Sequence, residues 1–186
     1  TGVPYMTFKD HANNKSNHKN IGTIKCSNLC SEVMQYSSIE DSNLSRTSIC
    51  TLSSVPLQKC IVNGEFDHNL LFKRVRLITR SLNKIVDINK YSTLEGELGG
   101  KEQRALGIGI QGLADTFAIL GYNFISDEAK KLNKEIAETI YFAAMSSSNE
   151  LAQETGLTYD YYNDSPISKG IFQFEMWDNF KQEDLS

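Results

Sequence analysis

The longest helical pattern in the sequence limits the folds that this chain can adopt. Ser126 is a favourable N-cap, and Asp127 and Glu128 follow it at the positive end of the helix dipole. Gly156 is a typical C-terminal stop, and one apolar stripe lies between the two ends: Leu132, Ile136, Ile140 and Ala143. A helix of roughly 28 residues would be ~42 Å long. Because this is long for a globule of 186 residues, the pattern predicts a helix that packs against a larger body.

A second long helix and two strands are predicted from the middle of the chain. Asp67 can cap a helix that ends near Asn89, with its apolar face at Leu71, Val75, Ile78, Leu82 and Ile85. Ser48–Val62 is predicted to be extended, with Pro56 ending or kinking the strand. Ala105–Ile110 is short and apolar, which is typical of a buried strand.

The remaining segments complete a helix-rich chain. A short helix is predicted over Leu113–Leu120, where Gly121 stops it. Four stretches are predicted to be irregular: residues 1–20, 35–46, 97–100 and the aromatic tail from Tyr159. The sequence contains no internal repeat.

Composition and charge exclude several classes of protein. A net charge of -4 and a pI near 5.4 give no basic surface for nucleic acid or an anionic membrane. No apolar run approaches the ~20 residues of a membrane span, and no signal peptide is visible, so a cytoplasmic protein is expected. The chain begins at Thr1 without an initiator Met and ends on a polar run. We therefore expect a piece of a longer polypeptide.

The four cysteines are expected to be reduced. The length, the long helical patterns and the missing secretion signal argue against a small disulfide-stapled domain. On a strand, Cys26 and Cys30 would be ~13 Å apart, beyond disulfide reach. Cys26 and Cys60 fit best as small buried hydrophobic residues. A reversible redox pair remains open.

Three reactive groups occupy alternate positions in the segment Lys25–Glu32. Asn28, Cys30 and Glu32 carry an amide, a thiol and a carboxylate. In an extended strand they would share one face, with ~6–7 Å between neighbours at ~3.3 Å per residue. Burying an acid and an amide beside a thiol costs free energy unless a ligand or the protein satisfies them. The pattern predicts an active-site strand; the alternative is a strand edge whose polar residues face water.

Other motifs favour structural interpretations. Gly107–Gly112 matches the dinucleotide fingerprint G-x-G-x-x-G, but a short preceding strand and no clear ribose-binding acid favour tight strand–helix packing. The adjacent Tyr161 and Tyr162 suggest electron transfer, although packing and hydrogen bonding are the more common use of such pairs. His11 and His18 lie near cysteines, but C-x3-C on a strand splays its thiolates, so no metal site is expected.

Six segments together resemble the large, catalytic subunit of class I ribonucleotide reductase. They are TGVPYMTFKD, KSNHKNIGTIKCSNLCSE, SICTLSS, LNKIVDIN, LGIGIQGLAD and SPISKGIFQFEMW, and the similarity covers essentially the whole chain. The resemblance implies an enzyme that reduces ribonucleoside diphosphates to deoxyribonucleoside diphosphates. It also implies an α/β fold, in which residues 1–186 form a helix-rich, incomplete part of a ten-stranded catalytic barrel domain.

The resemblance implies a role for each reactive residue. Cys30 matches the thiol that becomes a thiyl radical and abstracts the 3′ hydrogen of the ribose. Glu32 matches the carboxylate that takes the 3′-hydroxyl proton, and Asn28 matches the amide that holds the ribose hydroxyls. Cys50 matches one half of the redox pair that delivers two electrons as the 2′-hydroxyl leaves as water.

Several parts of the family machinery are not found in the sequence. These are the second redox cysteine segment, the N-terminal effector regions, the C-terminal part of the barrel with the phosphate-binding loop, the radical-relay tyrosines and the C-terminal thiol pair. Tyr161 and Tyr162 do not match the relay context. The resemblance implies that this piece binds no cofactor and is inactive alone.

The partners implied by the resemblance belong to the full enzyme. They are ATP and dNTP effectors, a metal-containing small subunit that generates the radical, thioredoxin or glutaredoxin, and further copies of the large subunit. The alternative for the chain itself is a non-catalytic folded fragment that offers only packing and interaction surface.

Overall fold

The computed structural model describes residues 4–38 and 45–177, which form two compact units. The loop unit contains the described residues of Thr1–Cys50, Lys90–Arg104 and Thr158–Ser186. The helix-pair unit contains Thr51–Asn89 and Ala105–Leu157. Both units lie within the range that the sequence assigns to one barrel domain, and that assignment stays a prediction.

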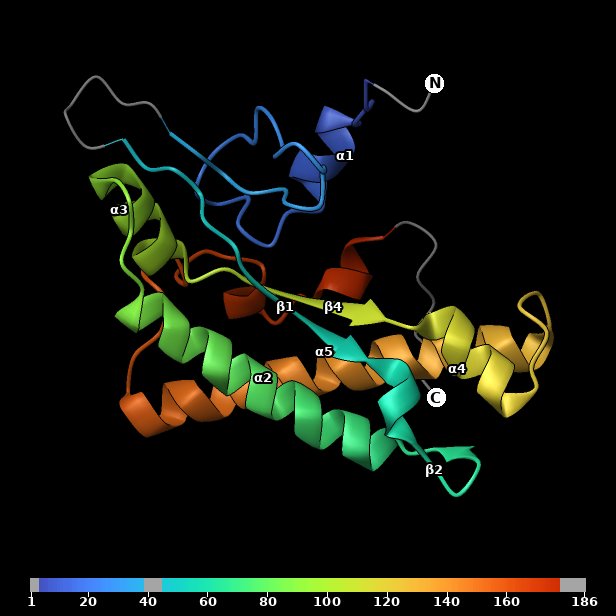
Figure 1. Cartoon of the computed structure of the whole chain (residues 1–186). Coiled ribbons are helices and arrows are strands. Elements are labelled where there is room, and N and C mark those ends of the chain that lie inside the picture. The colour runs from blue at the N-terminus through green and yellow to red at the C-terminus, as the bar shows by residue number, and fades with distance from the viewer. Residues whose placement is uncertain (1–3, 39–44, 178–186) are drawn as a thin grey trace. The chain divides into compact units, whose positions relative to one another are not determined.

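A parallel pair of strands forms the main sheet of the helix-pair unit. β1 (Thr51–Pro56) pairs with β4 (Leu106–Gln111), from Thr51 opposite Leu106 to Pro56 opposite Gln111. The two strands run side by side in Figure 1. The β1–β4 sheet has two strands and is not closed within the described residues. A mixed α/β fold is therefore confirmed, whereas the ten-stranded barrel is not tested.

Pro56 ends β1, as predicted from the sequence. The 3-10 helix η1 (Leu57–Cys60) follows it, and a small antiparallel pair then leads into the next helix. That pair consists of β2 (Ile61–Val62) and β3 (Glu65–Phe66). Because proline has no N–H to donate to a sheet ladder, it suits the last position of the strand.

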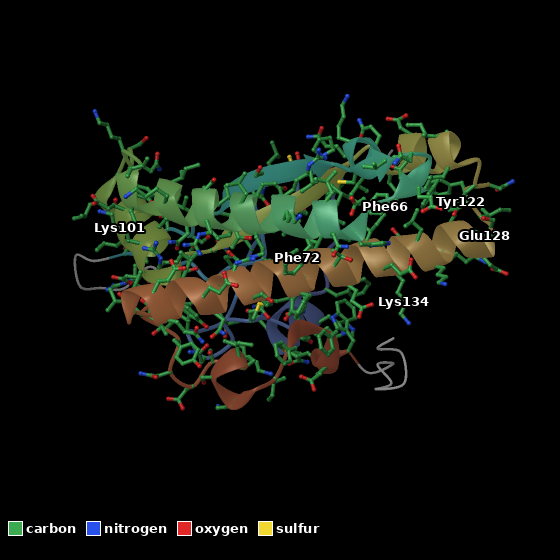
Figure 2. The ribbon with its side chains drawn as sticks, turned by 90° about the horizontal axis from the view of Figure 1, so that it is seen from below. Phe66, Phe72, Lys101, Tyr122, Glu128 and Lys134 are labelled. Atoms are coloured by element: carbon green, nitrogen blue, oxygen red, sulfur yellow. The ribbon has the colours of Figure 1, made fainter. Side chains whose placement is uncertain are left out.

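The two long helices lie side by side and run in the same direction. They are α2 (His68–Ile88) and α5 (Asp127–Thr155). Ion pairs join Arg76 to Glu150 and Arg80 to Glu154, and the common offset along both helices requires a parallel arrangement. The views in Figures 1 and 2 agree on this pairing, and the ring of Phe72 on α2 meets that of Phe142 on α5.

Apolar burial holds the helix-pair unit together. Its core joins the sheet, the helices and η1 through these buried residues: Val55, Leu57, Cys60, Leu71, Val75, Phe117, Ala129, Leu132, Ile136 and Ala143. Full burial of a Leu, Ile or Val side chain contributes about 1.5–3 kcal/mol. The apolar stripes predicted for both long helices therefore form the core of this unit. Ile85 is the exception, with 41% of its surface exposed.

Helix ends in this unit follow the predicted caps. The Asp67 carboxylate accepts a hydrogen bond from the Leu70 N–H, and the Ser126 hydroxyl accepts one from the Ala129 N–H. Gly156 ends α5 in the left-handed conformation. Gly121 does the same for α4 (Leu113–Leu120). These boundaries confirm the helix predictions. None of the helices in the described part of the chain has both the length and the apolar character needed to cross a membrane.

Short helices and irregular segments make up the loop unit. The helices are α1 (Lys9–Asn14), α3 (Leu94–Gln103), η2 (Ile167–Lys169) and η3 (Gln173–Met176). The irregular aromatic tail is confirmed as far as residue 177. The prediction of a loop throughout residues 1–20 is wrong because α1 forms there. The surface excursion predicted for residues 35–46 lies partly outside the described residues.

The prediction of a Gly-rich loop at residues 97–100 is also wrong, because these residues form the centre of α3. The Thr93 hydroxyl caps the helix by accepting from the Gly96 N–H. A Cβ at Gly99 would lie 2.1 Å from the carbonyl oxygen of Thr47, and one at Gly100 would lie 2.7 Å from the ring of Tyr91. The glycines therefore allow close packing of α3, and this tertiary contact outweighs their low helix propensity.

Candidate active site

The segment that carries Cys30 forms a tight turn. The Ser31 N–H donates to the Asn28 carbonyl at 3.0 Å, and Ser31 has the left-handed φ of 63°. Cys30 and Leu29 lie at the tip, and 89% of the Leu29 surface is exposed. Cys30 is therefore exposed at the tip of this turn.

Two hydrogen bonds close the base of this turn at Val33. The Asn28 Oδ1 atom accepts from the Val33 N–H at 3.0 Å. The Ser27 hydroxyl donates to the Val33 carbonyl at 2.7 Å. Val33 is thus held through both of its backbone polar groups. A backbone N–H can only donate, so the Asn28 atom that faces it must be the amide oxygen.

The strand predicted across Asn28, Cys30 and Glu32 is therefore wrong. Asn and Ser side chains compete with sheet ladders by bonding to nearby backbone groups, and both Ser27 and Asn28 do so here. The side chains of all three predicted residues are exposed. Asn28, Cys30 and Glu32 therefore lie on or beside a turn and do not alternate along a strand.

Cys50 lies half-buried immediately before β1. Burial raises the pKa of its thiol, and the negative charge of Glu32 raises it further. Glu32 is therefore close enough to Cys50 to act on it electrostatically. None of the four cysteines is in a disulfide, and Cys60 is buried as predicted. The prediction that Cys26 is buried is wrong, since Cys26 is exposed.

Hydrogen bonds connect the chain leaving the Cys30 turn to the chain approaching Cys50. The Ser37 hydroxyl oxygen accepts from the Ser48 N–H at 2.9 Å, and the two hydroxyls lie 2.9 Å apart. Ser38 and Arg46 form an antiparallel bridge with backbone distances of 3.0 and 3.2 Å. These contacts join residues 37 and 38, which follow the Cys30 turn, to residues 46 and 48, which precede Cys50. No pattern in the sequence predicts them, because isolated serines have no characteristic spacing.

A second group of polar contacts holds Arg46, four residues before Cys50. Arg46 forms a two-point ion pair with Glu102 at the end of α3, at 2.6 and 3.1 Å. The Tyr161 hydroxyl donates to the same carboxylate at 2.6 Å. Burial disfavours ionisation of Glu102, but the bonds from Arg46 and Tyr161 outweigh it and lower its pKa. Burial and the hydrogen bond to Glu102 raise the pKa of Tyr161 to about 12.

The tyrosine pair therefore acts in packing and hydrogen bonding, as the sequence favoured. Tyr161 bonds to Glu102, and the Tyr162 ring packs edge-on against Tyr159 with centroids 5.9 Å apart. The His18 ring lies against Tyr159 at 5.3 Å, and burial lowers the pKa of His18. Within residues 4–38 and 45–177, no group of three or more His, Cys, Asp or Glu side chains is arranged to hold a metal ion.

The glycine motif lies at the end of β4 and the start of α4. A Cβ at Gly109 would meet the Ser54 side chain of β1 at an ordinary 3.7 Å. Gly112, the N-cap of α4, has a φ of 70°, and a Cβ there would lie 2.2 Å from the Gln58 amide. Only glycine fits this position without strain. These contacts join Gly109 to β1 and Gly112 to η1, so the interpretation as strand–helix packing stays a prediction.

Comparison with known proteins identifies the class to which this arrangement belongs. The family model described as "Ribonucleotide reductase, barrel domain" matches residues 1–186, and the chain belongs to this family. The resemblance predicted from the sequence is therefore confirmed.

The most similar relatives include three proteins named ribonucleoside-diphosphate reductase large subunit. Identity is 46% over 178 residues with the protein of Trypanosoma brucei brucei, covering 96% of this chain and 20% of the relative. The Vaccinia virus (strain Copenhagen) protein is 49% identical over 177 residues, covering 95% of this chain and 22% of the relative. For Caenorhabditis elegans the identity is 47% over 178 residues, with the same coverage of 95% and 22%. The chain thus spans about a fifth of the length of these relatives.

Proposed function

We propose that the complete protein containing this chain reduces ribonucleoside diphosphates to deoxyribonucleoside diphosphates, and so supplies DNA precursors. In this reaction a ribonucleotide and two thiols give a deoxyribonucleotide, one disulfide and water. The observation that supports the proposal most strongly is the joining of the Cys30 turn to the Cys50 segment, with Glu32 acting on Cys50. A hydrogen-abstracting thiol, a base and a reducing thiol thus come from adjoining segments.

Three groups of the Cys30 turn would act on the ribose. Cys30, as a thiyl radical, would take the 3′ hydrogen atom and form an S–H bond. The Glu32 carboxylate would accept the 3′-hydroxyl proton, which favours loss of the 2′-hydroxyl. Because the Asn28 oxygen already accepts from Val33, its amide N–H groups are the atoms that would hold the ribose hydroxyl oxygens.

Cys50 would supply the reducing half of the reaction. Its raised pKa keeps it as the protonated thiol at neutral pH, so it retains an S–H proton for the departing hydroxyl. After donating, Cys50 would close to a disulfide with a second cysteine. The partner would lie outside these 186 residues, since Cys26 and Cys60 do not match it. Thioredoxin or glutaredoxin would then reduce the disulfide.

The rest of the polypeptide would complete the barrel and shield the radical. Cys30 is exposed here, whereas a thiyl radical requires protection from water. An open apolar groove of 430 Å³ lies between β4 and α5, lined by residues such as Leu106, Ile108, Ile136 and Ile140. This apolar surface supports the addition of further barrel elements, up to the ten strands that the family fold implies.

Further components belong to the proposed holoenzyme. A small subunit would generate the radical with its metal centre, and ATP and dNTP effectors would bind regions outside this chain. Large subunits would associate with one another, and the cytoplasm would be the site of action. The isolated chain would bind no cofactor and would be inactive alone.

The proposal is tested by assaying CDP reduction with the complete polypeptide, its small subunit and thioredoxin. Wild-type protein should form dCDP over many turnovers. Cys50→Ser should lose thioredoxin-dependent turnover, because it cannot form the disulfide. Cys26→Ser is the matched control, since Cys26 is a free thiol without an assigned role. Full turnover by Cys50→Ser, or no dCDP from the wild type, would contradict the proposal.

A further inference from the structure

We propose that Ser27 is a positioning residue of the reductase, whose hydroxyl sets the geometry of the Cys30 turn. This inference rests on the proposed function, because it concerns the placement of the thiol that begins the chemistry. Ser27 itself is not assigned to the reaction.

Packing does not fix the tip of the turn. Cys30 is exposed, and Leu29 leaves 89% of its surface uncovered. A side chain in such a position gains little from burial, so the backbone of the turn must be held in another way. Hydrogen bonds within the turn are the remaining source of order.

Four hydrogen-bond contacts lie within the turn, and Asn28 takes part in three of them. Its carbonyl accepts from Ser31 at 3.0 Å, and its Oδ1 atom accepts from the Val33 N–H at 3.0 Å. The Ser27 hydroxyl lies 3.3 Å from the same Oδ1 atom and 2.7 Å from the Val33 carbonyl oxygen, the shortest of the four contacts, so its single proton is donated to Val33. Ser27 is therefore the side chain that closes the turn without a predicted role at the ribose.

The Ser27 and Asn28 bonds act on the same residue from opposite sides. Val33 donates to one side chain and accepts from the other, so its peptide groups cannot rotate without breaking a bond. Loss of the Ser27 hydroxyl would leave the partly buried Val33 carbonyl unpaired and loosen the base of the turn. Cys30, Asn28 and Glu32 would then lose their common alignment.

This role predicts a specific kinetic pattern. A misplacement of about 1 Å in a catalytic group can lower the rate about 100-fold. Ser27→Ala should therefore lower kcat for CDP by about 10- to 100-fold, with a smaller change in KM. Ser27→Thr keeps a hydroxyl at the same position and should restore most of kcat. Ser31→Ala is the matched control, because its hydroxyl forms no hydrogen bond within the described residues and its turn-forming N–H remains.

The experiment is steady-state CDP reduction by the complete polypeptide with small subunit and thioredoxin, for wild type, Cys30→Ser and these three serine variants. Melting temperature is measured for each, and amide exchange at Val33 should be faster in Ser27→Ala than in wild type. Activity in the wild type and none in Cys30→Ser establishes the assay chemistry independently of Ser27.

Two results would overturn the positioning role while leaving the proposed function intact. One is a wild-type kcat in Ser27→Ala, and the other is a kcat for Ser27→Thr as low as that of Ser27→Ala. If Ser27→Ala does not fold, Ser27→Thr decides: kcat near that of Ser31→Ala supports the role, and inactive but folded protein refutes it. Activity retained in Cys30→Ser would instead refute the proposed function, and the positioning role with it.

Discussion

The helix-pair unit and the loop unit are ordered by different interactions. The helix-pair unit buries aliphatic side chains such as Leu71, Val75 and Ile136 almost completely between two long helices and a sheet. Among its described residues the loop unit buries few apolar side chains, Ile24 among them, and it depends on hydrogen bonds and on glycine contacts of α3. All four residues proposed to act in the reaction belong to the loop unit. The reactive groups thus lie where short-range polar contacts, and not a broad apolar core, determine their positions.

The largest effect is expected in the core of the helix-pair unit. Leu71→Ala removes a fully buried side chain and should lower the local unfolding free energy by about 2–5 kcal/mol. Leu77→Ala on the same helix is the control, since Leu77 is 67% exposed and should cost less than about 0.5 kcal/mol. Native-state hydrogen exchange at α2 amides in the complete protein measures both. Similar losses for the two variants would contradict an apolar core at Leu71.

In the loop unit, a single added methyl should have the next largest effect. Gly99→Ala places a Cβ against the backbone of Thr47, so α3 must move, at a cost of about 1–3 kcal/mol. Gly96→Ala is the matched control, because its Cβ would be 3.3 Å from the Thr93 hydroxyl oxygen. Gly99→Ala should lower the protection of the α3 amides from hydrogen exchange much more than Gly96→Ala does. Equal protection would mean that α3 does not pack tightly on Thr47.

The hydrogen bond from Tyr161 should give a smaller and pH-dependent effect. Tyr161→Phe removes a hydrogen bond to a carboxylate. Such bonds contribute about 1.5–3 kcal/mol when well buried, and because this one is only partly buried we expect a loss of about 1 kcal/mol. The pKa of Tyr161 is raised from 10 to about 12, so this stabilisation is complete below about pH 10 and is lost as pH rises through about 12. Denaturation experiments across this pH range should show that the wild type loses stability at alkaline pH and that Tyr161→Phe loses less. Tyr162→Phe is the control and should keep the alkaline loss.

The same cluster has the opposite dependence at acid pH. The pKa of Glu102 is lowered from 4.5, so its contribution is complete above that value and is lost as pH falls through the lower folded value. Glu102→Gln should therefore flatten the acid limb of the stability curve of the loop unit. An acid limb identical to that of the wild type would show that Glu102 does not contribute to this pH dependence.

The smallest effect concerns the influence of Glu32 on Cys50. Burial is the main cause of the raised Cys50 pKa, and Glu32 adds to it. Glu32→Gln should lower that pKa and modestly accelerate alkylation of Cys50 at a fixed pH, because more of the thiol is then ionised. Mass spectrometry of the Cys50 peptide separates its reaction from those of the exposed thiols. Glu32→Asp keeps the charge and is the control. An unchanged alkylation rate of Cys50 in Glu32→Gln would show that the Glu32 charge does not act on Cys50.

Elements with strong periodicity could be predicted from the sequence, whereas those formed by tertiary contact could not. The spacing in α2 and α5 and their caps at Asp67 and Ser126 defined both helices to within a residue or two. The helix α3 was missed because three glycines resemble a loop until the contact of Gly99 with Thr47 is known. No local pattern reports such a contact.

The candidate site, too, could be predicted only in part from the sequence. The assignment of Asn28, Cys30, Glu32 and Cys50 to the site stays a prediction from the sequence, whereas the predicted strand geometry was wrong, because side-chain bonds to Val33 convert the segment into a turn. Ser27 was missed, since one serine beside a reactive motif carries no signal of its own.

The central claim, that Cys30 begins the reaction, is tested most directly by comparing two thiols of the same segment. Cys30→Ser and Cys26→Ser are introduced separately into the complete polypeptide, and CDP reduction is measured with small subunit and thioredoxin. The account predicts no dCDP from Cys30→Ser, with folding and CDP binding preserved, and activity near wild type from Cys26→Ser. Reduction by Cys30→Ser would contradict the account.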